Sequence, residues 1–475
     1  MDKQTLLLYC DLIPDTTLLK PNHNRTSFSV RNCFVGQHIL DFETKDLDKI
    51  NFTVSPQIEL STLEYAGRPW AVRTFDQGHM KDHDSMIVVG LMGGWTPDKL
   101  KNTWYWLNGP TRRWALTDAR CQIVFDYSLE GFTELVFPYF WNWIQQHQLD
   151  DRVVYISSSI NVSESYKEWC RINGVFPNMR CLWSGFFAKN IYSALPFAVH
   201  IEGRKQDANH KLSHPLKHDD IIKEMNRLMD TYQYRPGRDH RIMSLNRRPH
   251  IHRLLMTIML KRRGVIPDMA ISFPKDFSEP AEWMPPNYDK MKRQWSVLRG
   301  HMAGHADHLE QDFQDLYDNI LPLTVDRSDF GTNHAHDLNM EMYRRHPINL
   351  ITETLAFDSS VFFSEKIWKP MLMRQVFLVW AAPQYLKWMR SIGFKTFEPY
   401  INEEYDDILD DMDRADAIAR ECKRLVSLPQ VEFDQLLIRC RATVEHNQRL
   451  VTSREFMENT SQREVIKYIK NLGKI

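Results

Sequence analysis

The chain has 475 residues, and this length favours two domains because a single hydrophobic core rarely grows beyond about 250 to 300 residues. Hydrophobic residues make up 43% and charged residues 25% of the sequence, a composition that excludes a mainly disordered chain. Because 60 Lys and Arg residues nearly balance 61 Asp and Glu residues, no net field directs the chain toward nucleic acid or an anionic membrane.

Seven cysteines are spread along the sequence without CxxC spacing, which argues against a disulfide framework and a zinc ribbon. The first residues lack the basic and long apolar segments of a signal peptide, and no apolar run approaches roughly 18 residues. We therefore expect reduced thiols, no membrane span and a location in the cytoplasm of a bacterial or virus-infected cell.

The N-terminal half alternates strand-like and helix-like segments. Strands are predicted at 5–13, 85–94, 121–128 and 152–159, and helices at 134–147 and 163–172. Strands separated by helices are typical of a parallel sheet. The pattern predicts an acceptor-side α/β domain over residues 1–207, followed by a polar linker at 208–239 that contains a Pro-Gly break.

A second α/β series starts at residue 240. Strands are predicted at 240–246, 268–273, 347–357, 376–381 and 394–397, and helices at 252–264, 364–374 and 384–393, with Gly264 ending the first helix. A looser polar insert covers 275–339. These elements predict a second Rossmann-like domain over 240–400, and the charged remainder, 401–475, is predicted to be helical.

The strongest candidate for a site is the sequence FDSSVFFSEK at 357–366, where a buried strand ends and a helix begins. Ligands of open parallel sheets bind at the carboxyl ends of strands, and a helix N-terminus favours phosphate oxygens. We predict that Ser364 caps the helix, that Glu365 accepts hydrogen bonds from a ribose diol, and that Lys366 neutralises a diphosphate. The alternative is that Ser364 and Glu365 only cap the helix and that Lys366 is a solvated charge.

A second candidate is SLNRRPHIHR at 244–253, again at a strand end and a helix start. It concentrates Arg and His residues where a helix terminus holds phosphate, and Arg253 is the best candidate for a diphosphate clamp. The alternative is a basic helix start that contacts only solvent or a local carboxylate. An Arg in the first turn opposes the helix dipole, which favours an anion nearby.

Together the two motifs resemble the donor domain of the α-1,3-fucosyltransferases. The signature of that family has a Phe-Glu-Asn start, a Tyr-Val-Thr-Glu-Lys centre and an apolar strand ending in Pro-Val, matched here by FDSS, FFSEK and VFLVWAAP. A Ser-Asn stretch with Pro and a phosphate-binding Arg is matched by SLNRRPHIHR. The likeness covers residues 242–397, and the departures at 358–359 and 363–364 leave the nucleobase and the sugar open.

This resemblance implies a nucleotide-sugar donor site in the C-terminal domain. Carried over, Glu365 binds the ribose, Lys366 the phosphates and Arg253 the diphosphate. The remaining donor-binding candidates within the two motifs are Asn246, Arg248, Ser360 and Ser364. The resemblance also implies the GT-B glycosyltransferase fold, in which two Rossmann-like α/β domains face each other across a cleft.

The reaction implied is inversion by direct displacement, without a metal and without a cofactor besides the donor. Such a reaction needs a base in the N-terminal domain to take the proton of the acceptor hydroxyl. Asp126 and Glu130, at the end of the strand at 121–128, are our candidates. The alternative is that Asp126 is a turn residue and Glu130 is an acid on the surface of a helix. Further candidates are Asp76, His79 and Asp84.

Three readings of the function stay open. The first is sugar transfer to a glycan or another hydroxyl acceptor. The second follows from NRRPxxHR and SEKxxKP, which are similar to uncharacterised glycosyltransferases of bacteria and large bacteriophages, and has a hydroxymethylated pyrimidine of DNA as acceptor. The third is a non-catalytic protein that binds nucleic acid or a partner through its 14 Trp, 17 Tyr and 25 Phe residues.

Other charged and metal-binding residue types are predicted to be solvated. The histidines of the polar insert lack neighbouring cysteines, and the acidic run lies in a charged helical segment. These residues are His301, His305, His308, His334, His336, Asp406, Asp407, Asp410, Asp411 and Asp413. The sequence has neither a GxxxxGK[ST] phosphate loop nor a GxGxxG motif, which argues against an NTPase and a dinucleotide oxidoreductase.

Overall fold

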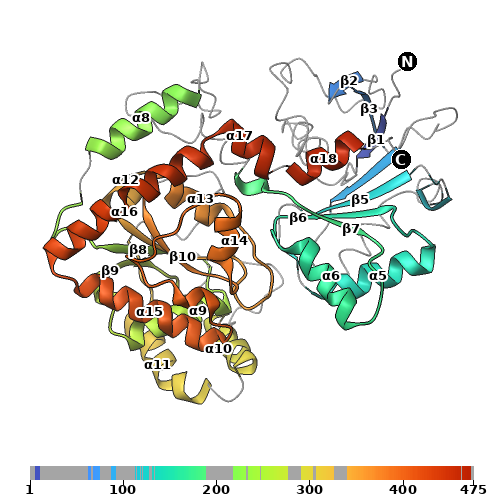
Figure 1. Ribbon diagram of the computed structural model, residues 1–475. Coiled ribbons are helices and arrows are strands. Elements are labelled where there is room, and N and C mark those ends of the chain that lie inside the picture. The colour runs from blue at the N-terminus through green and yellow to red at the C-terminus, as the bar shows by residue number, and fades with distance from the viewer. Residues whose placement is uncertain are drawn as a thin grey trace, which may run out of the picture. The chain divides into compact units, whose positions relative to one another are not determined.

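The computed structural model divides the chain into two compact units (Figure 1). Unit 1 comprises Met1–Phe186 and Met457–Ile475, and unit 2 comprises Phe187–Phe456. The structure describes residues 6–10, 62–65, 68–74, 87–92, 113, 115–117, 119, 121–127, 131–132, 134–188, 218–231, 234–246, 248–275, 290–302, 306–325, 340–461 and 463–471.

Unit 1 is built on a seven-stranded sheet of order β2-β3-β1-β4-β5-β6-β7. Its strands are parallel except for the β2–β3 pair. The strands are β1 (Leu6–Cys10), β2 (Thr62–Tyr65), β3 (Arg68–Thr74), β4 (Ile87–Met92), β5 (Cys121–Tyr127), β6 (Val153–Ser157) and β7 (Arg180–Trp183). The predicted alternation of strands and helices is therefore confirmed in this unit.

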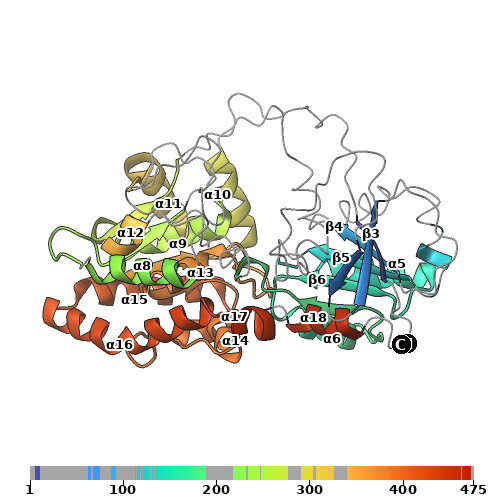
Figure 2. The ribbon, with the colours of Figure 1, turned by 90° about the horizontal axis from the view of Figure 1, so that it is seen from above.

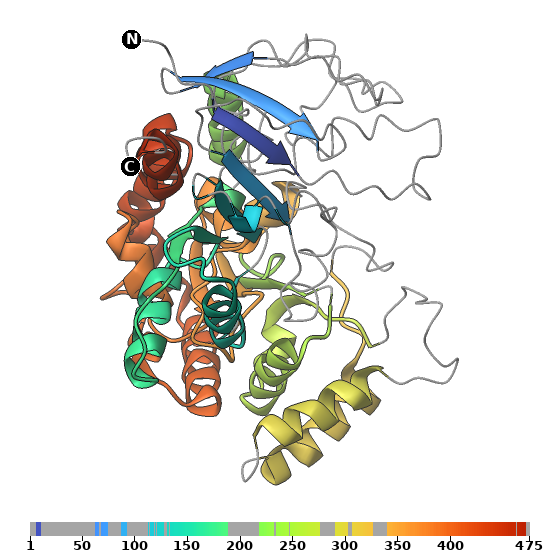
Figure 3. The same ribbon diagram turned by 90° about the vertical axis from the view of Figure 1, so that its right-hand side faces the viewer.

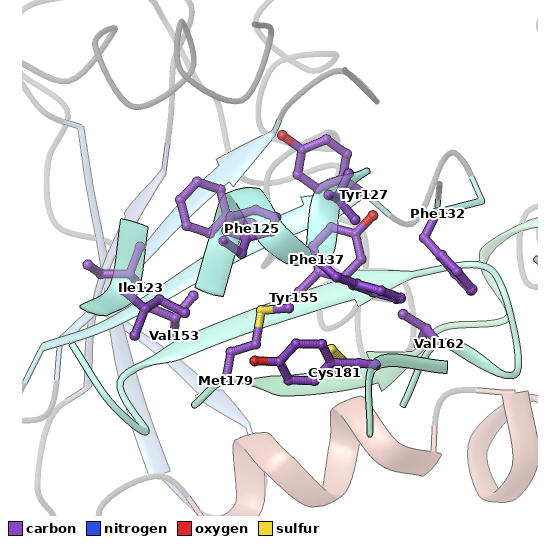
Figure 4. Close-up of a cluster of buried hydrophobic side chains, with 14 of the residues drawn as sticks. Ile123, Phe125, Tyr127, Phe132, Phe137, Val153, Tyr155, Val162, Met179 and Cys181 are labelled. Atoms are coloured by element: carbon purple, nitrogen blue, oxygen red, sulfur yellow. The ribbon is translucent and has the colours of Figure 1, made fainter. Parts of the chain in front are cut away.

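The core of unit 1 lies between the β5 and β6 strands and two helices, α5 (Val136–His147) and α6 (Val162–Ile172) (Figure 4). Aromatic rings fill it: the centroids of Phe125 and Phe140 are 4.8 Å apart, and those of Phe137 and Tyr166 are 5.4 Å apart. Rings at these separations add to the free energy gained by burying apolar area. The long aromatic helix predicted at 134–147 is therefore the core helix of this sheet.

The end of the chain returns to unit 1 through helix α18 (Arg463–Asn471), which lies beside the sheet (Figures 1 and 2). The amide of Trp183 at the end of β7 donates to Glu464 Oε2 at 2.7 Å, and the amide of Gly185 donates to the carbonyl of Ser461 at 2.6 Å. An edge strand has unpaired donors that need acceptors. The C-terminal tail, Met457–Ile475, supplies these acceptors. The sequence pattern had grouped this tail with the helices that begin at residue 401.

Unit 2 is built on a four-stranded parallel sheet of order β11-β10-β8-β9. The strands are β8 (Ile242–Leu245), β9 (Met269–Ser272), β10 (Ile348–Thr352) and β11 (Val376–Trp380), and they are almost wholly buried. A parallel strand with both faces buried reads as a continuous apolar run. All four strands were predicted, although β10 ends at Thr352 and not at residue 357.

Helices lie around this sheet (Figure 1), and the yellow helices near residue 300 are seen from another side in Figure 3. Helix α8, within the predicted linker, belongs to unit 2, where Asp230 pairs with Arg374 at 3.0 Å. The helices are α8 (His218–Thr231), α9 (Ile251–Arg262), α10 (Lys290–His301), α11 (Glu310–Asp315), α12 (Met340–Arg345), α13 (Glu365–Leu372), α14 (Tyr385–Ser391), α15 (Asp411–Ser427), α16 (Gln430–Val451) and α17 (Arg454–Phe456). The polar insert predicted at 275–339 thus contains two of these helices, α10 and α11. In the described part of the chain, no helix is long and apolar enough to cross a membrane.

The strand predicted at 394–397 is wrong, because that segment is not extended into a strand and pairs with none of the strands that the structure describes. Phe394 and Phe397 are both buried, which is a spacing of three and not the alternation of a strand. The side chain of Asn447 replaces a neighbouring strand here, since it accepts from the amide of Lys395 at 2.9 Å and donates to its carbonyl at 2.8 Å.

Gly185 gives a test of the tail contact. A Cβ at this position would lie 2.6 Å from the Cβ of Ser461, closer than two carbon atoms can approach. We expect Gly185→Ala to reduce the stability of the protein by about 1–3 kcal/mol, as overpacking does, and Ser461→Gly to restore part of the loss. Gly300→Ala, at an open position of α10, is the control and should be neutral or slightly stabilising. Equal denaturation midpoints for Gly185→Ala and wild type would contradict the contact.

Candidate functional site

The candidate site lies at the carboxyl edge of the sheet of unit 2, where α9 and α13 begin. Asn246 follows β8, and Glu353 follows β10. His250 is the N-cap of α9, and Ser364 is the N-cap of α13 and accepts from the amide of Lys366. The prediction that Ser364 caps its helix is therefore confirmed. Two helix N-termini at one edge provide backbone donors and positive dipole ends for an anion.

Arg253, the third residue of α9, has a buried guanidinium with unused bonding capacity. The residue is 5% exposed, and its Nη1 donates to the carbonyl of Arg248 at 3.2 Å. Its Nε is buried and has no hydrogen-bond partner. Burial lowers the pKa of Arg253 to about 10, against the attraction of Glu365 and Glu353, so the group is charged at neutral pH. A buried cation with an unused donor is costly without an anion.

Lys366 lies in the first turn of α13, and its ammonium has three acceptors. Nζ donates to Thr354 Oγ1 at 3.0 Å, to Ser364 Oγ at 3.3 Å and to Glu365 Oε1 at 2.8 Å. The side chains of Lys366 and Glu365 are 25% and 23% exposed. Burial raises the pKa of Glu365, but the charge and hydrogen bond of Lys366 outweigh it and hold that pKa at about 2. Lys366 is thus a fixed cation at the helix N-terminus.

Glu353 is fully buried and connects the elements that meet at this edge. Its carboxylate accepts from Ser364 Oγ, from the amide of Ser364 at 3.3 Å, from the amide of Thr354 at 3.1 Å and from the hydroxyl of Tyr385 at 2.8 Å. Burial raises the pKa of Glu353, against the charge of Lys366 and these hydrogen bonds. One carboxylate thereby holds the end of β10 to the starts of α13 and α14.

Two stacked histidines lie at the start of α9. The rings of His250 and His252 are 5.8 Å apart and nearly parallel, and His252 Nε2 donates to the carbonyl of Glu353 at 2.7 Å. Burial and the charges of Arg253, Arg248 and Lys366 lower the pKa of His250 to about 3, and burial lowers the pKa of His252. Both imidazoles are therefore neutral near pH 7 and add no charge to the site.

The loop after β10 is held by Arg414 of α15. This buried guanidinium donates to the carbonyls of Ala356 at 2.9 Å, Ile408 at 2.8 Å and Ala381 at 3.2 Å, and it lies over the ring of Trp380. Asp411 gives it a carboxylate partner. A buried cation is stable only when its donors are satisfied in this way. The loop that leads to α13 is therefore fixed from the side of α15.

The structure brings Arg253, Glu365 and Lys366 together, since the charge of Glu365 acts on Arg253 and Lys366 bonds to Glu365. Asn246 accepts from Thr352 Oγ1 and donates to Ser244 at 3.1 Å. Of the other donor-binding candidates, Arg248 is exposed and Ser360 is fully buried.

The predicted catalytic residues belong to unit 1. Asp126 lies one residue before the end of β5, so its backbone is at the carboxyl edge of that sheet. Glu130, Asp76, His79 and Asp84 lie outside the described residues. Asp126 and Glu130 therefore stay predictions.

Two of the residues that were predicted to be solvated make specific contacts, and one of them is buried. Asp406 is buried and accepts from the amides of Leu386 at 2.8 Å and Lys387 at 3.0 Å, so it caps α14 and is not part of a solvated face. His301 is exposed, but its ring stacks on Phe357 with centroids 4.4 Å apart. Within the described part of the chain, no group of three or more His, Cys, Asp or Glu residues is placed to hold a metal ion.

Sequence reasoning missed Glu353 and Arg414. Glu353 follows five buried strand residues, and a charge directly after such a run is the signal that identifies it. Arg414 lies in a helix rich in charged residues, where nothing local separates a buried Arg from an exposed one.

No family model matches the sequence, and neither does any curated protein. Among solved structures, an alpha,alpha-trehalose-phosphate synthase (UDP-forming) from Burkholderia vietnamiensis is 9% identical, with a TM-score of 0.44 over 100% of this chain and 99% of that chain. An alpha,alpha-trehalose 6-phosphate synthase from Burkholderia multivorans is 10% identical, with a TM-score of 0.37 over 98% of each chain. At these TM-scores neither likeness assigns an activity.

The depressed pKa values of the two histidines predict how stability depends on pH. A His whose pKa is lower in the folded state stabilises the protein fully above its unfolded pKa of about 6.5, and that stability is lost as the pH falls toward the folded pKa. For His250 the window runs from about 6.5 down to about 3. Each such group contributes a slope of up to about 1.4 kcal/mol per pH unit.

We expect His250→Asn, which keeps a good N-cap residue, to flatten the decline of unfolding free energy between pH 6 and pH 4. Denaturant unfolding at a series of pH values measures this slope. His308→Asn, at an exposed position, is the control and should follow wild type. Identical slopes for His250→Asn and wild type would show that His250 titrates normally in the folded protein.

Proposed function

We propose that the protein is a nucleotide-sugar-dependent glycosyltransferase whose donor diphosphate binds at the carboxyl edge of the sheet of unit 2. The observation that carries the proposal is the buried guanidinium of Arg253, whose Nε has no partner. Such a group is stabilised by a buried anion, and the N-termini of α9 and α13 favour negative charge at the same edge. The resemblance of SLNRRPHIHR and FFSEK to the α-1,3-fucosyltransferase donor motifs supports a nucleotide sugar as that anion.

The charges at the site suggest how the donor is held. Arg253 and Lys366 are cations beside the carboxylate of Glu365, whereas burial raises the pKa of Glu353. When a diphosphate arrives, Lys366 exchanges its bond to Glu365 for a phosphate oxygen, because a diphosphate brings more negative charge to the ammonium than one carboxylate does. Glu365 then has an oxygen to accept from the ribose diol. The two cations neutralise the leaving group, so the proposed reaction needs no metal and no cofactor besides the donor substrate.

The proposed reaction is an inverting displacement. The acceptor oxygen attacks the anomeric carbon as the bond from that carbon to the diphosphate oxygen breaks, and the nucleoside diphosphate leaves with the bonding electrons. The proton of the acceptor hydroxyl passes to a carboxylate of unit 1, for which we propose Asp126 or Glu130. The arrangement requires the two units to face each other in the GT-B manner. The acceptor is a glycan-type hydroxyl.

The proposal is tested by a thermal-shift screen with nucleotide sugars and nucleoside diphosphates, followed by assay of diphosphate release with an acceptor. A donor that binds only the folded state raises the melting temperature, and a mismatched nucleotide does not. If every nucleotide in the panel leaves the melting temperature unchanged, the proposed activity is refuted.

Arg253→Met should weaken binding of the nucleoside diphosphate by about tenfold or more, because a charge-assisted hydrogen bond contributes about 1.5–3 kcal/mol. Isothermal calorimetry measures the dissociation constant. Arg263→Met, at the other end of the same helix, removes an Arg that pairs with Asp416 at 2.5 Å and should bind as wild type does. Unchanged affinity in Arg253→Met would exclude Arg253 from the phosphate site.

Asp126→Asn keeps the shape of the side chain but removes its basicity. Loss of a general base should lower turnover by about 10²-fold to 10⁴-fold while the affinity for the donor stays unchanged. Steady-state rates combined with donor calorimetry separate the two effects. Glu130→Gln is the matched second variant, and wild-type turnover in both would move the search to Asp76, His79 and Asp84.

A further inference from the structure

Glu353 bonds to residues that hold Lys366 and does not bond to Lys366 itself. We propose that Glu353 is a positioning residue that fixes Lys366 at the N-terminus of α13 for the diphosphate, an inference that rests on the proposed donor site. The residue is fully buried at the end of β10 and lies outside both sequence motifs that suggested the site. It is not a ligand of the donor, and its effect passes through Ser364 and Thr354.

The path from Glu353 to Lys366 follows two of the three acceptors of the ammonium. Ser364 gives both its amide and its hydroxyl hydrogen to Glu353, which leaves the lone pairs of Ser364 Oγ for the amide and the Nζ of Lys366, each at 3.3 Å. Thr354 donates its amide to Glu353 at 3.1 Å and accepts from Lys366 Nζ at 3.0 Å through its hydroxyl. Glu353 thereby sets the orientation of both groups that hold Lys366.

A carboxylate is required at this position. Oε1 accepts from the amide of Ser364 and the hydroxyl of Tyr385, and Oε2 accepts from the amide of Thr354 and the hydroxyl of Ser364. In a Gln, whichever oxygen is replaced by the NH2 group would place its hydrogens against a backbone amide, which can only donate, and against a hydroxyl that would have to turn its own hydrogen away. Since the cluster is buried, water does not compensate for the lost bonds.

The backbone of Glu353 also connects the end of β10 to the start of α9 and to β11. Its carbonyl accepts from His252 Nε2 at 2.7 Å, and its amide donates to the carbonyl of Trp380 at 2.9 Å. The indole of Trp380 in turn donates to the carbonyl of His252 at 2.8 Å. Arg253 follows His252 in α9, so one residue anchors both helix starts from which the proposed phosphate ligands extend.

A double-mutant cycle on Glu353→Gln and Lys366→Met tests the inference, with nucleoside diphosphate affinity measured by calorimetry. Each single variant should bind about tenfold more weakly, and Glu353→Gln should cause no further loss in the Lys366→Met background, because residues that act through one another are not additive. A purely structural role of Glu353 would give additive losses and would overturn the inference.

Glu403→Gln is the matched control. Glu403 is also a buried carboxylate of unit 2 whose pKa is raised by burial, and its partners Phe397 and Arg390 belong to neither α9 nor α13. The control should reduce the denaturation midpoint as Glu353→Gln does, while leaving the affinity for the diphosphate unchanged. An equal loss of affinity in both variants would mean that reduced stability, and not positioning, weakens binding.

Hydrogen exchange separates failure of this inference from failure of the proposed function. If the wild-type protein binds no nucleoside diphosphate, the proposed function fails, and the positioning role is then judged from the amides of α13 without ligand. Glu353→Gln should accelerate exchange of the amides of Ser364 and Lys366, and Glu403→Gln should not. Exchange at wild-type rates in Glu353→Gln would overturn the inference.

Discussion

A carboxylate in a protein interior must be surrounded by hydrogen-bond donors, because burial without them costs several kcal/mol. Glu353 meets this requirement with four donors from three segments, and this cluster holds together the edge of unit 2 at which β10 ends and α13 and α14 start. The buried apolar strands β10 and β11 determine where this edge of the sheet lies. The hydrogen bonds of Glu353 determine how the residues at the edge are oriented.

Most charged groups of the proposed site are held by hydrogen bonds within the protein. Lys366 has three acceptors and the carboxylate of Glu353 has four donors, whereas Arg253 keeps a buried Nε without a partner. The histidines beside them are neutral, so the positive charge at this edge comes from the Arg and Lys side chains. If a diphosphate binds here as proposed, Arg253 Nε donates to it and only the bond from Lys366 to Glu365 has to be exchanged.

Much of the fold follows from local sequence, because buried parallel strands are short apolar runs and the helices between them have polar starts. The four strands of unit 2 and the Ser364 cap were predicted on this basis. The missing parts depend on contacts between distant residues. Glu353 and Tyr385 are 32 residues apart, and Gly185 meets Ser461 only because the tail returns to unit 1. Asp406 was taken for a solvated acid because its partners, the first amides of α14, lie 20 residues earlier.

The predicted donor residues divide in the same way. Glu365, Lys366 and Arg253 are candidates because a helix start after a buried strand places charge at the sheet edge by geometry alone. Asn246 stays a prediction; its side chain bonds to Ser244 and Thr352, and the Thr352 contact, 106 residues away in sequence, is not visible in the local pattern. Local pattern thus indicates a candidate site, and long-range hydrogen bonds determine how its side chains are oriented.

A crystal structure of the protein with a bound nucleoside diphosphate tests whether the donor phosphates bind at the carboxyl edge of the sheet of unit 2. We expect phosphate oxygens within hydrogen-bonding distance of Arg253 Nε and Lys366 Nζ, with the bond from Lys366 to Glu365 replaced. A diphosphate bound elsewhere, with Arg253 Nε still without a partner and the ion pair of Lys366 and Glu365 intact, would contradict it.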